Sequence, residues 1–109
     1  MRRSGKSLTE YARKKLGEIH ALSARYNGKG GAHADKLLGL MRKHVEEIEQ
    51  LHAAGDPHYA VETGDLLVLC HEILLEGRED ADLVMEKCYR RYEEKLRELL
   101  SEDLEGKRE

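Results

Sequence analysis

The chain has 109 residues, a length that suggests one domain with a modest core. Charged residues make up 38% of it and aromatic residues 5%, with no Phe, no Trp and one Pro, which favours long helices over a β-sandwich or barrel. The formal charge of −3 and the short apolar runs predict no nucleic-acid partner and no membrane span. We expect no signal peptide, and because the two cysteines form neither a zinc motif nor a disulfide framework, we expect a cytoplasmic protein.

The first expected helix runs from about Leu8 to Tyr26. Ser7 and Glu10 form a capping box at its start. Its apolar residues recur at helical spacing: Leu8, Ala12, Leu16, Ile19 and Leu22. The glycine-rich segment Asn27 to Gly31 then predicts a flexible turn.

The second expected helix runs from about Asp35 to Ala54 and ends at Gly55. Its apolar stripe consists of Leu37, Met41, Val45, Ile48 and Leu51. Asp56 and Pro57 predict the start of a third helix, with Asp as the N-cap and Pro at the first helical position. The short turn between the two helices predicts an antiparallel hairpin.

The third expected helix ends at Glu76, before Gly77, and is apolar on most of its circumference. The runs Leu66 to Cys70 and Ile73 to Leu75 give it this character, which indicates a helix buried on most sides. We therefore expect it at the centre of the bundle or of an interface between subunits.

The fourth expected helix runs from about Asp82 to Leu104, with a charged outer face. Its apolar stripe consists of Val84, Cys88, Tyr92, Leu96 and Leu99. The sequence thus predicts a single all-α domain over residues 1–109, a four-helix bundle with frayed tails at about 1–6 and 105–109. We expect a homodimer or homotetramer to complete the core.

Two acidic pairs flank the predicted hairpin turn. Glu46 and Glu49 are three residues apart on the second helix, and Glu62 and Asp65 are three apart on the third. Residues at this spacing share a helix face, so each pair can direct both carboxylates to one place. Clustered carboxylates on an apolar helix are costly unless a cation or a proton neutralises them, and hard oxygen ligands suit Mg²⁺, with Mn²⁺ as a substitute.

The simpler interpretation is that these acidic pairs only form a solvated helix surface, because 22 acidic residues in 109 give many such pairs by chance. The Glu62 and Asp65 pair argues more strongly against it, because Leu69 and Glu72 continue the same side of the most apolar helix.

The ordered pair of motifs resembles the MazG-like superfamily of all-α nucleoside triphosphate pyrophosphohydrolases. The pattern Glu-x-x-Glu, spacer, Glu-x-x-Asp is present as Glu46 to Glu49, a spacer from Gln50 to Val61, and Glu62 to Asp65. The apolar continuation Leu66 to Leu69 and the preceding Lys43 are similar to the family as well. The resemblance covers roughly Leu37 to Leu99 and implies a MazG-like bundle.

The register of the first motif has an alternative. Family members often carry Glu-Glu-x-x-Glu, and aligning Glu46 and Glu47 with the double Glu places Gln50 at a metal position. The register with Glu46 and Glu49 keeps four carboxylates and is preferred for that reason, while Glu47 and Gln50 remain the possible replacements.

The resemblance implies hydrolysis of a nucleoside triphosphate to the monophosphate and pyrophosphate. Magnesium is expected on Glu46, Glu49, Glu62 and Asp65, which are also the expected catalytic residues. Lys43, Lys87 and Arg91 are the expected contacts to phosphate, with ordinary surface ion pairs as the alternative for the last two. Two other functions stay open: phosphoribosyl-ATP pyrophosphohydrolase, a related fold, and a non-catalytic helical interaction module.

Several weaker signals carry no function. Gly5-Lys6-Ser7 lacks the first glycine of a phosphate-binding loop. His44 and His52 do not share a helix face, so we expect no zinc pair. His58 lies one turn before Glu62, within reach of the site, although an exposed residue at a helix start is the simpler interpretation. No grouping of serine, histidine and acid in the sequence argues for a nucleophilic triad.

Overall fold

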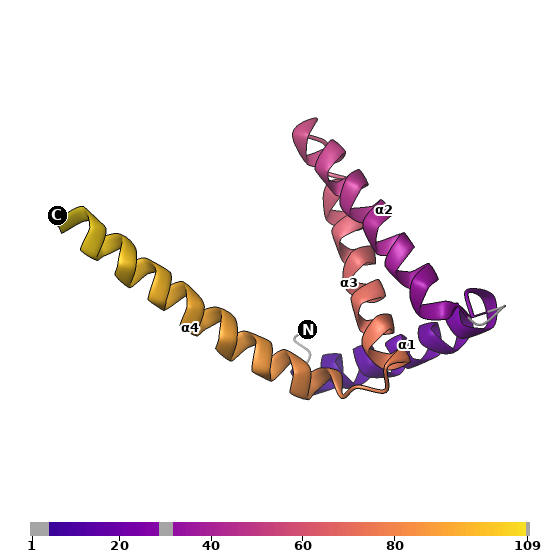
Figure 1. Cartoon of the computed structure of the whole chain (residues 1–109). Coiled ribbons are helices and arrows are strands. Elements are labelled where there is room, and N and C mark those ends of the chain that lie inside the picture. The colour runs from indigo at the N-terminus through magenta and orange to yellow at the C-terminus, as the bar shows by residue number, and fades with distance from the viewer. Residues whose placement is uncertain (1–4, 29–31, 109) are drawn as a thin grey trace. The chain divides into compact units, whose positions relative to one another are not determined.

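A computed structural model describes residues 5–28 and 32–108, with side chains described for residues 10–28 and 32–104. Every regular element in these residues is an α-helix, which confirms the predicted all-α class (Figure 1). The chain divides into two compact units, Met1–Arg78 and Glu79–Glu109. The first unit holds three helices and the second holds one, and each is described by itself.

The four helices follow the predicted order. They are α1 (Gly5–Tyr26), α2 (His33–Ala53), α3 (Tyr59–Glu76) and α4 (Ala81–Arg108). The predicted helix ends are shifted by a few residues, most at the end of α4, which continues past Leu104 to Arg108. The Ser7 side chain of the predicted capping box, residues 29–31 of the predicted turn, and residues 1–4 and 109 of the predicted tails lie outside the described part of the chain.

The hairpin of α2 and α3 is the main packing contact of the first unit (Figure 1). Gly55 ends α2 with φ +70°, and its N–H donates to the His52 carbonyl at 3.1 Å. This left-handed conformation favours glycine, so the predicted helix end is confirmed. The third helix begins at Tyr59 and not at Pro57, because Asp56 Oδ1 accepts from the His58 N–H at 2.9 Å and closes a turn before the helix.

The apolar core of the described residues is small. Leu37 and Leu69 are the only buried apolar side chains there, at 0% and 7% exposed. Three polar side chains accompany them in burial: Ser23, His33 and Glu72. Val61 and Leu67 remain exposed on α3 at 55% and 59%, so the prediction that this helix is buried on most sides does not hold within the first unit.

None of the helices in the described residues combines the length and the apolar character that crossing a membrane requires.

Candidate functional site

A histidine and two carboxylates meet across the hairpin. His44 and Glu47 belong to α2 and Glu62 belongs to α3. One potential ligand atom from each lies within 4.8 Å of the others, and all three side chains are half-buried. We call these three residues the candidate metal-ligand cluster. It is the one such group of histidine, cysteine and acidic residues in the described part of the chain.

Two further side chains extend the cluster. His44 Nε2 lies 3.4 Å from Glu62 Oε2 and 3.8 Å from Asp65 Oδ2. On the other side, His58 Nε2 lies 3.5 Å from Glu62 Oε1. The Glu62 side chain is 16% exposed and the Asp65 side chain is 57% exposed. Glu62 is therefore the sheltered centre of the site, and Asp65 and His58 form its solvent-facing rim.

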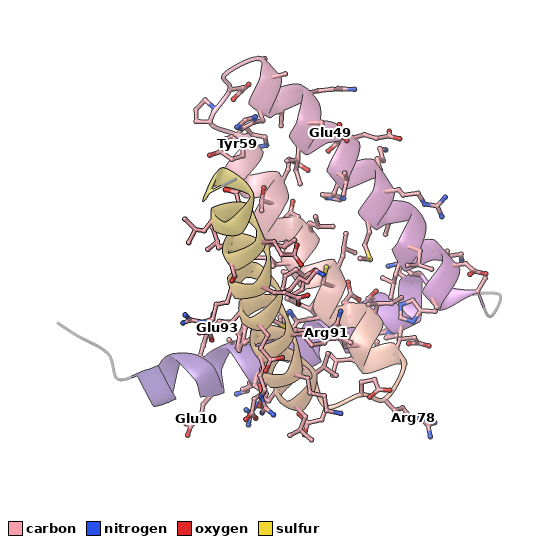
Figure 2. All side chains as sticks on the ribbon, turned by 60° about the vertical axis from the view of Figure 1, so that its left-hand side comes forward. Glu10, Glu49, Tyr59, Arg78, Arg91 and Glu93 are labelled. Carbon is pink, nitrogen blue, oxygen red and sulfur yellow. The ribbon has the colours of Figure 1, made fainter. Side chains whose placement is uncertain are left out.

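Helix geometry explains which acids of α2 reach α3. Successive residues turn by about 100° around a helix axis, so Glu47 lies about 60° from His44. By the same rule Glu46 lies about 160° and Glu49 about 140° from His44. Both are exposed, and Figure 2 shows Glu49 on the side of α2 turned away from α3. Of the four predicted carboxylates, the structure brings Glu62 and Asp65 to the cluster, with Glu47 as their partner from α2.

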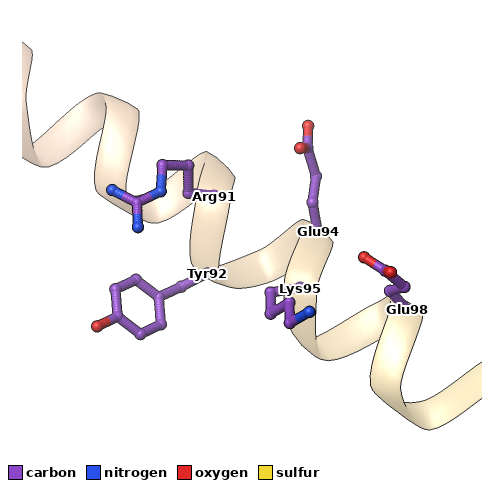
Figure 3. A pocket seen from close by; sticks show the side chains of 5 residues that line it. All are labelled: Arg91, Tyr92, Glu94, Lys95 and Glu98. Atoms are coloured by element: carbon purple, nitrogen blue, oxygen red, sulfur yellow. The ribbon is translucent and has the colours of Figure 1, made fainter.

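The predicted phosphate contacts are exposed cations. Lys43 precedes His44 on α2. Lys87 and Arg91 are exposed residues of α4, in the second unit. Arg91 borders a surface hollow together with Tyr92, Glu94, Lys95 and Glu98 (Figure 3). Since all five side chains come from one helix, the hollow has only one wall and does not enclose a nucleotide.

A second polar cluster lies at the other end of α3. His20 Nε2 lies 3.5 Å from Glu76 Oε2, and His20 Nδ1 lies 3.9 Å from Glu72 Oε1. His20 Nδ1 and Glu72 Oε1 are buried and have no hydrogen-bond partner. His33 stacks on His20 with ring centroids 5.6 Å apart. Each acid along this face of α3 therefore has a histidine beside it, from Glu62 to Glu76.

Part of this second cluster has the order of a serine triad, which the sequence did not indicate. Ser23 Oγ lies 3.1 Å from His33 Nε2, and His33 Nδ1 lies 2.7 Å from Glu76 Oε2. Asn27 Nδ2 donates to Ser23 Oγ at 2.9 Å. Ser23 is 9% exposed and His33 6%, so a substrate has little access to the hydroxyl. The arrangement serves to connect α1, α2 and α3.

Apart from His58, the histidines of the two clusters are residues that the sequence analysis does not predict. The sequence suggests His44 only as a partner of His52, and no pattern marks His20 or His33. A usable signal exists at one of them, because His44 is three residues before Glu47 and therefore shares its face. The partners across the hairpin depend on the packing of α2 against α3, which spacing along one helix does not specify.

The donor set fits a divalent cation. Two carboxylates with a third nearby supply the hard oxygen atoms that Mg²⁺ and Mn²⁺ accept. The imidazole nitrogen of His44 is a ligand that suits first-row transition ions better than Mg²⁺. The group of side chains is thus suited to a cation but is not the all-carboxylate set that the sequence predicts.

Comparisons with protein-family models, with curated proteins and with solved structures found no match to this chain.

Proposed function

We propose that this chain is a nucleoside triphosphate pyrophosphohydrolase that depends on a divalent cation, with Mg²⁺ as the expected ion and Mn²⁺ as a substitute. The observation that carries the proposal is the convergence of Glu47, Glu62 and His44 to within 4.8 Å, with Asp65 beside them. The resemblance of the Glu62 to Asp65 motif to the MazG-like superfamily supplies the reaction class.

The proposed reaction is hydrolysis at the α-phosphorus. Water forms a new oxygen–phosphorus bond there, the bond to the bridging oxygen of the β-phosphate breaks, and pyrophosphate leaves. A carboxylate of the site accepts the proton of the attacking water. A divalent cation held by Glu47, Glu62 and Asp65 would supply positive charge to the phosphates and lower the pKa of the bound water.

Cationic side chains are needed to balance a triphosphate. Lys43 is exposed on α2, next to His44 in the sequence, and is the proposed phosphate contact nearest to the cluster along the chain. Lys87 and Arg91 are exposed on α4 and are proposed for the same role. Their contribution would show as a raised KM when either is replaced by alanine.

We propose a homodimer or homotetramer as the working form. The small core supports this, since Leu37 and Leu69 are the only buried apolar side chains of the described residues. On α4, Tyr92, Leu96 and Leu99 are 67%, 57% and 46% exposed, so an apolar stripe is available for burial against another copy. Light scattering coupled to size exclusion measures the mass, and a monomer at micromolar concentration would contradict this proposal.

Both cysteines are free thiols, which suits a reducing compartment such as the cytoplasm.

The test is a panel of ribonucleoside and deoxyribonucleoside triphosphates, assayed for pyrophosphate and monophosphate in the presence of Mg²⁺ or Mn²⁺. We expect the two products in equal amounts from at least one nucleotide. Glu62→Gln should lower kcat/KM by about 100-fold or more, the scale of losing one charge contact in an active site. Glu79→Gln, at an exposed residue outside the helices, is the matched control and should leave the rate unchanged.

The assignment of the α2 ligand has its own comparison. We expect Glu47→Gln to remove activity and Glu46→Gln and Glu49→Gln to retain it, because only Glu47 faces α3. The opposite result would restore the register with Glu46 and Glu49. If phosphoribosyl-ATP is the only nucleotide hydrolysed, the chain is instead the phosphoribosyl-ATP pyrophosphohydrolase of histidine biosynthesis. No turnover of any nucleotide by a folded, metal-loaded sample would leave the helical interaction module as the better description.

A further inference from the structure

The hydrogen bond of the His44 ring fixes its tautomer. His44 Nδ1 lies 2.9 Å from the carbonyl oxygen of Leu40, one turn earlier on α2. A carbonyl oxygen only accepts, so Nδ1 carries the hydrogen and donates it. In the neutral ring the remaining nitrogen, Nε2, then has an unprotonated lone pair.

That lone pair faces negative charge. Nε2 lies 3.4 Å from Glu62 Oε2 and 3.8 Å from Asp65 Oδ2, and the cluster adds Glu47 as a third acid. A cation placed between these atoms would contact one imidazole nitrogen and two carboxylate oxygens together, because the ligand atoms of His44, Glu47 and Glu62 lie within 4.8 Å of one another.

The spacing between His44 and Glu62 suits a small divalent ion. Metal bonds of about 2.1 Å to nitrogen and oxygen place neighbouring tetrahedral ligands about 3.4 Å apart. The distance between His44 Nε2 and Glu62 Oε2 is 3.4 Å. The backbone carbonyl bonded to Nδ1 is also the usual outer partner of a metal-bound histidine, because it orients the ring and fixes the tautomer.

We propose that His44 Nε2, Glu47 and Glu62 bind a first-row transition cation in preference to Mg²⁺, with Zn²⁺ and Co²⁺ tighter than Mn²⁺. The nitrogen donor is the reason, since imidazole suits these ions and the affinity of such a site rises from Mn²⁺ to Zn²⁺. Three protein ligands leave a coordination position open for water or a phosphate oxygen. This inference rests on the same site as the proposed function but does not depend on its reaction.

The test is calorimetric titration of the metal-free, full-length chain with Zn²⁺, Co²⁺, Mn²⁺ and Mg²⁺, without nucleotide. We expect Zn²⁺ to bind more tightly than Mg²⁺ by at least about tenfold. His44→Ala should lower the affinity for Zn²⁺ and Co²⁺ by at least about tenfold, which is the scale of disturbing a metal-bound histidine. The affinity for Mg²⁺ should be nearly unchanged. His71→Ala is the matched control, because His71 Nδ1 makes the same contact to the carbonyl one turn earlier, at 3.1 Å from Leu67 O.

Unchanged Zn²⁺ affinity in His44→Ala, or equal affinity of the wild type for Zn²⁺ and Mg²⁺, overturns the inference. A second measurement needs no variant to fold: long-range ¹H–¹⁵N spectra of the wild type should show the Nε2 resonance of His44 shifting on addition of Zn²⁺. An unshifted resonance would show that Zn²⁺ does not bind to His44, which also overturns the inference. Zn²⁺ binding without nucleotide turnover would instead defeat only the proposed function.

Discussion

His33 Nδ1 and Glu76 Oε2 lie 2.7 Å apart and join the first turn of α2 to the last turn of α3. Because a carboxylate accepts, His33 donates from Nδ1, and in the neutral ring its Nε2 accepts from the Ser23 hydroxyl at 3.1 Å. Ser23 in turn accepts from Asn27 at 2.9 Å. The hydrogen bonds thus run in one direction from α1 to α3, and each member of the series has its partner.

Ser23→Ala tests this connection. Removing the hydroxyl leaves His33 Nε2 without its donor in a residue that is 6% exposed, and an unpaired buried group costs about 1–3 kcal/mol. We expect the free energy of unfolding in urea to fall by about that amount. Ser101→Ala, on the exposed side of α4, should change it by less than about 0.5 kcal/mol. Equal effects of the two substitutions would contradict a stabilising role for the hydrogen-bond series.

Glu72→Gln tests the buried carboxylate. Glu72 is 5% exposed, and its Oε1 and the nearby His20 Nδ1 both lack a hydrogen-bond partner. The amide keeps the shape, removes the buried charge and offers an N–H to the imidazole, so we expect stability to rise by about 1 kcal/mol. For a domain of this size, that is a rise in Tm of about 4–8 °C. A fall in Tm would contradict a destabilising effect of the buried carboxylate.

Leu37→Ala tests the core. Leu37 is 0% exposed, and replacing a fully buried leucine by alanine costs about 2–5 kcal/mol. In a chain with so small a core we expect the loss to leave much of the sample unfolded at 37 °C, as measured by far-ultraviolet circular dichroism. Leu38→Ala, the next residue and 43% exposed, is the control and should melt close to the wild type. Similar melting of both variants would mean that Leu37 does not hold the core.

Gly55→Ala tests the hairpin turn. Gly55 has φ +70°, a conformation that costs a residue with a Cβ about 1–2 kcal/mol. Gly39→Ala is the matched change inside α2, where nothing lies within 4 Å of the added Cβ. Alanine is the better helix former, so Gly39→Ala should stabilise by about 0.5–1 kcal/mol. We therefore expect Gly55→Ala to lower the Tm and Gly39→Ala to raise it. A change of the same sign in both variants would contradict the assigned turn.

The helices could be predicted because their boundaries have local causes. Gly55 ends α2 through its own conformation, and the periodic leucines define where each helix continues. The start of α3 was harder, because Asp56 can cap either a helix or a turn. The structure shows the turn, with His58 as the donor to Asp56.

The site could be predicted on α3 but less well on α2. On α3, Leu69 shares a face with Glu62 and Asp65 and is 7% exposed, so the apolar pattern identifies the inward side. On α2 the predicted stripe is only partly correct: Leu37 is fully buried, but Val45 is 42% exposed, and His44 and Glu47 lie on the inward side. A shift of one residue rotates a helix face by about 100°, which is enough to replace one acidic pair by another.

The pairing of histidines with the acids of α3 also determines how the two helices of the hairpin align. Leucine side chains pack nearly as well after a slip of one helical turn, about 5.4 Å. The same slip would separate Glu62 from His44 and Glu76 from His33, whose present distances are 3.4 Å and 2.7 Å. Buried polar contacts of this kind select one alignment among several that the apolar residues would accept. The histidine–acid contacts thus fix the register of α3 relative to α2.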